Sequence, residues 1–164
     1  MKNFAYPSFR LQDSSLETRL VYSLFLLFVI AGLVTTWILQ FQRIGFSYER
    51  IVAYYLGGEI NGQTSFAKNF NVLLEETHFH TFIMGITFLV LSHLFIATSL
   101  RRGAKWFFIL LTFVANIADM AGVWLVRYIS PIFAYLLMTA WIGLWLGYLA
   151  MIFAPLYEMW LRPR

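Results

Sequence analysis

The three histidines of the chain, His78, His80 and His93, lie within a single apolar segment. Imidazole is costly inside a lipid bilayer, and there it marks a functional site by default. In a helix, with about 100° of rotation and 1.5 Å of rise per residue, His78 and His93 are about 60° apart around the axis and about 22 Å apart along it. They therefore share a face, with Gly85 near the midpoint. His80 lies about 160° round from His78, on a strip with Glu76.

This arrangement resembles a ligand helix of the cytochrome b superfamily, in which two haems stacked across the bilayer carry electrons between its faces. The resemblance covers this helix only. It implies haem b held by His78 and His93, with His80 as the replacement if His78 instead caps the helix end. Gly85 would let the flat macrocycle approach the backbone.

The cytochrome b family places the opposing histidines on a second helix, whereas this chain has no histidine elsewhere. The opposing ligand would then come from a partner chain, from a second copy in a homodimer or from a methionine, or the position would stay open. The candidate methionines are Met84, Met120 and Met138.

The run Thr77-His78-x-His80 also resembles a segment of small four-helix bacterial membrane proteins of unassigned function. Two later runs fit the same resemblance: Pro131-x-Phe133-Ala134-Tyr135 and Pro155-Leu156-Tyr157-Glu158. This resemblance spans most of the chain. It implies a multi-pass protein of the bacterial inner (cytoplasmic) membrane, without an activity.

Glu75-x-x-His78 matches one half of a di-iron carboxylate site, which needs a second such pair and two further glutamates. Only one copy is present, and Asp119 is a candidate for one further carboxylate. Non-haem iron is therefore a third hypothesis, after haem and quinone. Glu75 and Glu76 are also candidates for proton transfer together with His80.

Asp119 is the only charged residue inside an apolar span. We expect it about 5 Å outside the midplane, nearer the depth of His80 than of His93. It would handle protons, contact a quinol or accept from a ligand imidazole, or it is a structural aspartate bonded to Asn116 or a neighbouring helix.

Two arginines lie where haem propionates would need partners. Arg127 is expected near the outer surface, level with His78 and His80, and Arg101 near the inner one, beyond His93. Topology and snorkelling explain both arginines without a cofactor, and we favour that interpretation.

The elements that must position these residues are membrane helices. The 164 residues are 60% hydrophobic and only 12% charged, against about 25% charged in soluble domains. Four segments reach the roughly 20 apolar residues that span a bilayer: 20–40, 77–99, 106–126 and 131–154. We therefore predict one all-α domain over 1–164, an integral membrane four-helix bundle.

Lysine and arginine are more numerous on the side of both termini, which predicts cytoplasmic N and C termini. The outer segment 41–76 should contain short interfacial helices. One begins after the N-cap Ser47 and stops at Gly57-Gly58, and Asn71 would cap a turn into the second span. Gly143-x-x-x-Gly147 and Ala118-x-x-x-Gly122 favour close helix packing within the bundle, with dimerisation as the alternative.

These features favour a small non-catalytic subunit of a respiratory-type electron-transfer complex that binds haem. The alternative is a non-redox scaffold or anchor that contacts lipid, quinone or pigment. Expected partners are other membrane subunits or a homodimer mate, and a periplasmic cytochrome or the quinone pool. The chain has no cysteine, which excludes thiolate chemistry, and no basic stripe of the kind that binds nucleic acid.

Overall fold

The computed structural model describes residues 10–60 and 62–162, and four long helices dominate them. These are α1 (Leu16–Arg43), α3 (Phe70–Ile96), α4 (Arg102–Tyr128) and α5 (Ala134–Trp160). Each is long and apolar enough to cross a membrane. Short 3-10 turns, Leu11–Asp13 and Pro131–Phe133, precede α1 and α5. The predicted all-α membrane four-helix bundle is confirmed, and the protein is a multi-pass membrane protein.

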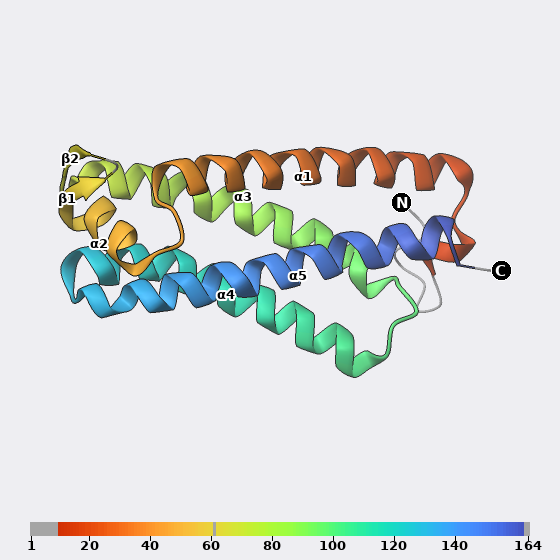
Figure 1. The fold of residues 1–164 in the computed structure, drawn as a ribbon. Helices are drawn as coiled ribbons and strands as arrows, with labels where there is room; N and C mark the ends of the chain where they lie inside the picture. Colours follow the sequence, from red (N-terminus) through yellow and green to blue (C-terminus); the bar gives the residue numbers. More distant parts are fainter. Residues whose placement is uncertain (1–9, 61, 163–164) are drawn as a thin grey trace.

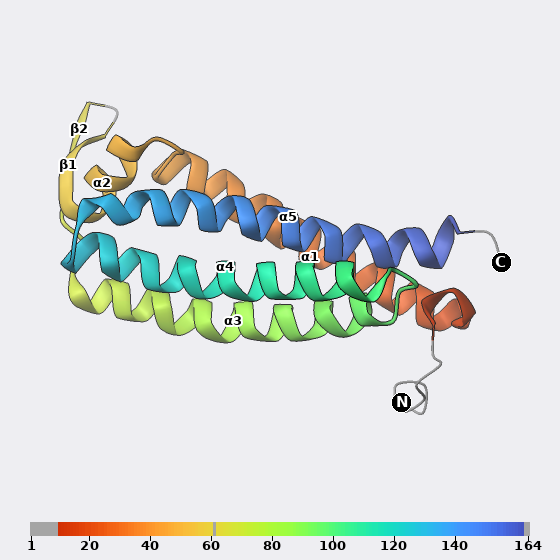
Figure 2. The same cartoon turned by 90° about the horizontal axis from the view of Figure 1, so that it is seen from below.

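The helices run alternately up and down between two ends of an elongated bundle (Figure 1). The start of α1, the end of α5 and the α3–α4 connection lie at one end, here called the terminal end. The 41–76 segment lies at the other, here called the loop end. In Figure 2, α3, α4 and α5 lie side by side and α1 crosses behind α5.

The tightest packing is between α4 and α5, where glycines of α5 face small side chains of α4. A Cβ added at Gly147 would collide with the Thr112 hydroxyl oxygen, and one at Gly143 would lie 3.1 Å from the Ala115 Cβ. The small-residue spacing therefore serves packing within the bundle, as expected.

The loop end contains α2 (Tyr48–Leu56) and a two-stranded antiparallel hairpin, β1 (Gly57–Ile60) and β2 (Gln63–Phe66). Ser47 is the N-cap of α2 and accepts from the Arg50 amide, as predicted. Helix α2 stops at its C-cap Gly57, as predicted, whereas the hairpin that follows was not predicted. Gly57 has φ 89°, a left-handed conformation that lets the chain turn directly from α2 into β1.

The helix boundaries also differ from the predicted spans, and two of the differences concern residues discussed above. Helix α3 begins seven residues before Thr77, and its cap is Asn69, which accepts from the Asn71 amide, rather than Asn71 itself. His78 therefore lies inside α3 and does not cap its end. Pro155 lies within α5 instead of past its end. Membrane helices tolerate proline because neighbouring groups satisfy the freed backbone carbonyl.

Helix α1 contacts the bundle along much of its length, because Tyr22, Phe25, Val29, Ile30 and Leu33 pack against the core cluster that contains Leu26. Leu26 is the one buried residue that the described part of α1 contains. Near the terminal end, Arg19 donates a 2.7 Å hydrogen bond to the Met159 carbonyl of α5. Towards the loop end, the rings of Trp37 and Trp145 are 4.4 Å apart. Between these attachments α1 forms one wall of a pocket.

Candidate functional site

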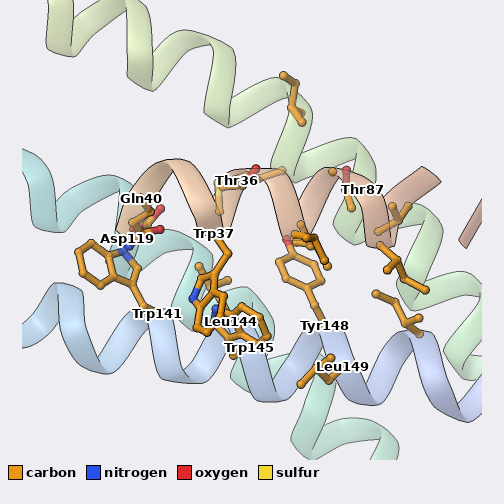
Figure 3. A pocket seen from close by; sticks show the side chains of 18 of the residues that line it. Thr36, Trp37, Gln40, Thr87, Asp119, Trp141, Leu144, Trp145, Tyr148 and Leu149 are labelled. Carbon is orange, nitrogen blue, oxygen red and sulfur yellow. Dashed lines mark hydrogen bonds between the residues drawn. The ribbon is translucent and has the colours of Figure 1, made fainter. Parts of the chain in front are cut away.

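A pocket of about 570 Å³ lies between α1, α3 and α5, with Asp119 of α4 at its floor (Figure 3). This volume is within the range of small-molecule and cofactor sites. Several lining side chains, including Phe28, Ile83 and Phe153, are more than half exposed. Because they lie midway along spanning helices, the pocket opens on a surface that faces lipid.

The pocket is polar at one end and apolar at the other. Gln40, His80, Asp119 and Trp141 line the part nearer the loop end, and Figure 3 shows Gln40, Asp119 and Trp141 together at one end. The part nearer the terminal end is lined by aliphatic and phenyl side chains: Phe28, Val29, Ile30, Leu33, Leu149, Ile152 and Phe153. The shape therefore suits an amphipathic molecule with a polar head and an apolar tail.

His80 presents one free ring nitrogen. Its Nδ1 lies 2.7 Å from the Glu76 carbonyl oxygen, one turn earlier in α3. A carbonyl only accepts, so Nδ1 carries the proton and donates it, and Nε2 of a neutral ring keeps its lone pair. The helical spacing correctly predicted that His80 lies on a different strip from His78, and Thr87, seven residues after His80, also lines the pocket.

Asp119 is held by the neighbouring helix. The Trp141 indole Nε1–H of α5 donates a 2.8 Å hydrogen bond to Asp119 Oδ1. One turn away on α4, Asn116 Oδ1 accepts a 3.0 Å bond from the Tyr148 hydroxyl. These two bonds join α4 to α5 along the pocket floor and fix the orientation of the carboxyl group.

Gln40 contributes a donor without a partner. Its Nε2 is buried and makes no hydrogen bond within the described structure. An unpaired buried donor costs about 1 to 3 kcal/mol, so such groups call for a partner that the chain does not supply. A ligand acceptor at this end of the pocket would supply it.

His78 and His93 lie on α3 outside this pocket, and both are exposed. The His78 ring packs edge-on against Phe82, with ring centres 5.2 Å apart. His93 Nδ1 lies 2.8 Å from the Leu89 carbonyl, so its Nε2 is also the free nitrogen. Gly85 has nothing within 4 Å of an added Cβ. This face is open to a flat molecule or to another helix.

The expected propionate partners are engaged elsewhere. Arg127 Nε donates a 2.9 Å hydrogen bond to the Lys68 carbonyl, and its guanidinium lies over the Tyr128 ring. Arg101 is exposed in the connection before α4. Neither lines the pocket, and no lysine or arginine is among the described residues that do.

The carboxylates do not form a metal site with the histidines. Within residues 10–60 and 62–162, no group of three or more histidine, aspartate or glutamate side chains is close enough to hold a metal ion. Glu75 is exposed, whereas Glu76 pairs with Lys68 at 3.2 Å. Burial alone would lower the pKa of Lys68, but Tyr54 and Glu76 outweigh it and the pKa is raised.

A family of proteins that share a transmembrane helical domain matches residues 45–164. The chain belongs to this family. The family domain comprises α2 to α5 and the hairpin, and α1 lies outside the matched range. The pocket is thus bounded by the family domain on one side and by α1 on the other. No curated protein and no solved structure shows significant similarity to the chain.

Sequence reasoning missed Gln40, Trp141 and Tyr148 as site residues. In the sequence, Gln40 is the last residue of the first predicted span. Trp141 and Tyr148 lie in the fourth predicted span, and aromatic residues are common in such apolar segments. The sequence alone does not single out Gln40, because Gln42 and Arg43 follow it within one turn and account for a span boundary there.

Proposed function

We propose that this protein binds a lipid-soluble quinone in the pocket between α1, α3 and α5, as a small non-catalytic subunit of a respiratory-type complex in the bacterial inner membrane. The observation that supports this most directly is the polarity gradient of a pocket that opens to lipid. A quinone has an oxygen-bearing ring and an apolar isoprenoid tail, which match the two ends of the pocket.

The charges of the pocket support a neutral ligand. Its described lining has one acidic group, Asp119, and no lysine or arginine. Haem in the same pocket would bring two propionates without a basic partner, which is unfavourable in a medium of low dielectric constant. A quinone ring brings no charge and offers oxygens to Gln40 Nε2. Trp37, Trp141 and Trp145 supply flat apolar surface for the ring.

Extraction of the purified protein tests this proposal. The full chain, purified from its native membrane in mild detergent, is extracted with organic solvent, and quinones are identified by absorbance and mass spectrometry. We expect close to one quinone per chain. Gly32→Phe should abolish this, because Gly32 lines the pocket and has open space where its side chain would project.

Gly85→Phe is the matched control, since Gly85 is also exposed, also has nothing within 4 Å of an added Cβ, and lies on α3 outside the pocket lining. It should keep the quinone. Absence of quinone from the wild-type protein, together with no binding of an added short-chain quinone, would refute the proposal. If both variants lose the quinone to the same extent, the quinone does not bind in this pocket.

A second candidate is haem b on the face of α3 that bears His78, Gly85 and His93, with the opposing ligands from a partner chain or a second copy. The observation in its favour is the ring state of His93, whose Nδ1–H is bound to the Leu89 carbonyl, leaving Nε2 as a metal ligand would need it. Gly85 leaves space on the same face.

The same two glycine variants separate the candidates. A reduced-minus-oxidised spectrum of the gently purified complex should show a b-type haem if this second candidate holds. Gly85→Phe and His93→Ala should then lose the signal, while Gly32→Phe keeps it. A complex without haem, or full retention of haem by His93→Ala, would refute the assignment to His93.

A further inference from the structure

The polar end of the pocket presents more hydrogen-bond acceptors than donors. His80 contributes a single free ring atom, Nε2, because its Nδ1–H is bound to the Glu76 carbonyl at 2.7 Å. In the neutral ring that atom only accepts. A ligand that lies against His80 must therefore bring a hydrogen of its own to satisfy it.

Asp119 adds further accepting capacity. The Trp141 indole donates a 2.8 Å hydrogen bond to Asp119 Oδ1. The other carboxyl oxygen, Oδ2, is left to accept a hydrogen bond from a ligand on the pocket floor. Because the Trp141 indole has only this one N–H, it cannot serve both oxygens.

Gln40 supplies the opposite chemistry at the same end. Its Nε2 is buried, has no partner in the described structure and only donates. A ligand oxygen there must accept. A head group that satisfies the polar end must therefore donate a hydrogen bond to His80 or Asp119 and accept one from Gln40.

A hydroxyl group does both, whereas a carbonyl oxygen only accepts. We infer that the pocket selects a hydroxylated aromatic head group, so that it binds the hydroquinone form of a lipid quinone in preference to the quinone form. This inference rests on the proposed quinone binding and states which redox form the site retains.

The aromatic part of the selection comes from the walls. The ring centres of Trp37 and Trp145 are 4.4 Å apart (Figure 3 shows the tryptophans). Phe46 packs edge-on against Trp141, with ring centres 5.5 Å apart. A flat ring packs against such surfaces better than a flexible chain does. A hydroxyl on an acyclic isoprenoid would satisfy the polar atoms but leave these faces uncovered.

Calorimetric titration of the full chain in detergent micelles tests the inference with four probes. They are a decyl-substituted benzoquinone, its hydroquinone under anaerobic conditions, the dimethyl ether of that hydroquinone, and farnesol. We expect the hydroquinone to bind about tenfold more tightly than the quinone, as one acceptor left without a donor in an apolar medium predicts. The dimethyl ether, which has lost both hydroxyl hydrogens, and farnesol should bind no better than the quinone.

His80→Phe should reduce the preference while the quinone still binds, because it deletes one of the two acceptors, Asp119 Oδ2 being the other, and keeps a ring of similar size. His78→Phe is the matched control, since His78 lies two residues away on α3 but outside the pocket lining, and it should keep the preference.

The outcomes separate the two proposals. Equal affinity for the two redox forms, or tighter binding of the quinone, overturns this inference and leaves quinone binding intact. Binding of the dimethyl ether as tight as that of the hydroquinone also overturns it. Farnesol binding as tightly as the hydroquinone overturns the aromatic requirement. Failure of all four probes to bind overturns both proposals.

Discussion

The Trp141 indole of α5 donates a 2.8 Å hydrogen bond to Asp119 Oδ1 of α4, and both residues line the pocket. This pair fixes the only carboxyl group on the pocket's described lining and ties together the two most closely packed helices. Structure and ligand binding therefore depend on the same bond.

Trp141→Phe should destabilise the protein by about 1 to 3 kcal/mol, because it leaves the half-buried Asp119 without its donor. Thermal unfolding in detergent, followed by circular dichroism, measures the loss. Trp160→Phe is the control, since Trp160 also donates a 2.8 Å bond, to Ser23 Oγ, but is 48% exposed. A loss as large in Trp160→Phe would show that the burial of the hydrogen bond is not what matters.

The four spans could be predicted from the sequence because a bilayer imposes a length and an apolar composition on each helix. The separation of His80 from His78 could also be predicted, since helical rotation alone fixes it. Both features depend on residues within a single segment.

The pocket could not be predicted because it depends on residues from four helices. Gln40, His80, Asp119 and Trp141 are up to about a hundred positions apart, and only the packing of α1 against the family domain brings them to one end of a cavity. The hairpin was missed for a local reason. A Gly-Gly pair is typical of a helix stop, and the same left-handed φ at Gly57 also allows a turn into a strand.

Gly147→Ala should destabilise the α4–α5 pair by about 1 to 3 kcal/mol, because the new methyl group would meet the buried Thr112 side chain. The melting temperature in detergent measures this. Gly85→Ala is the control, with nothing within 4 Å of the added atom, and should be neutral or up to about 1 kcal/mol stabilising.

A double variant, Gly147→Ala with Thr112→Ala, distinguishes a local clash from a loss of backbone freedom. It should recover part of the stability, since Thr112→Ala removes the hydroxyl that the methyl group meets. No recovery at all would mean that the cost of Gly147→Ala arises elsewhere.

Glu158 of α5 joins the α3–α4 connection to α5 at the terminal end through hydrogen bonds. It is 4% exposed, and its Oε2 accepts from the Ser99 amide at 3.0 Å, from the Ser99 hydroxyl at 2.8 Å and from Arg162 at 3.3 Å. Glu158→Ala should free the connection and increase its cleavage by trypsin at Arg101 and Arg102. Glu158→Gln keeps one accepting oxygen and should be cleaved more slowly than Glu158→Ala.

Glu75→Ala serves as the control, because Glu75 is exposed on α3 far from this connection in sequence. Its cleavage rate should equal that of the wild type. If Glu158→Ala is also cleaved at the wild-type rate, the hydrogen bonds to Ser99 do not restrain the connection.

Lys68 holds the segment between the hairpin and α3 in place, and its contribution to the stability of the fold should depend on pH. Its Nζ lies 3.2 Å from Glu76 Oε1 and 4.3 Å from the centre of the Tyr54 ring. Burial opposes the charge, but Tyr54 and Glu76 raise the pKa of Lys68 above its usual value. A pKa that is higher in the folded than in the unfolded chain gives stability that is complete below about pH 10.4. That stability is lost as the pH rises through the folded pKa.

Lys68→Met should therefore unfold at a lower temperature than the wild type by an amount that is constant from pH 7 to about pH 10 and shrinks above it. Thermal unfolding of both proteins in detergent across this range measures the difference, and other groups that titrate cancel between them. Lys68→Arg should hold its charge and its stability to higher pH, because the guanidinium does not deprotonate there. A difference between wild type and Lys68→Met that stays constant up to pH 11.5 would show that apolar contacts of the Lys68 stem, and not its charge, hold the segment in place.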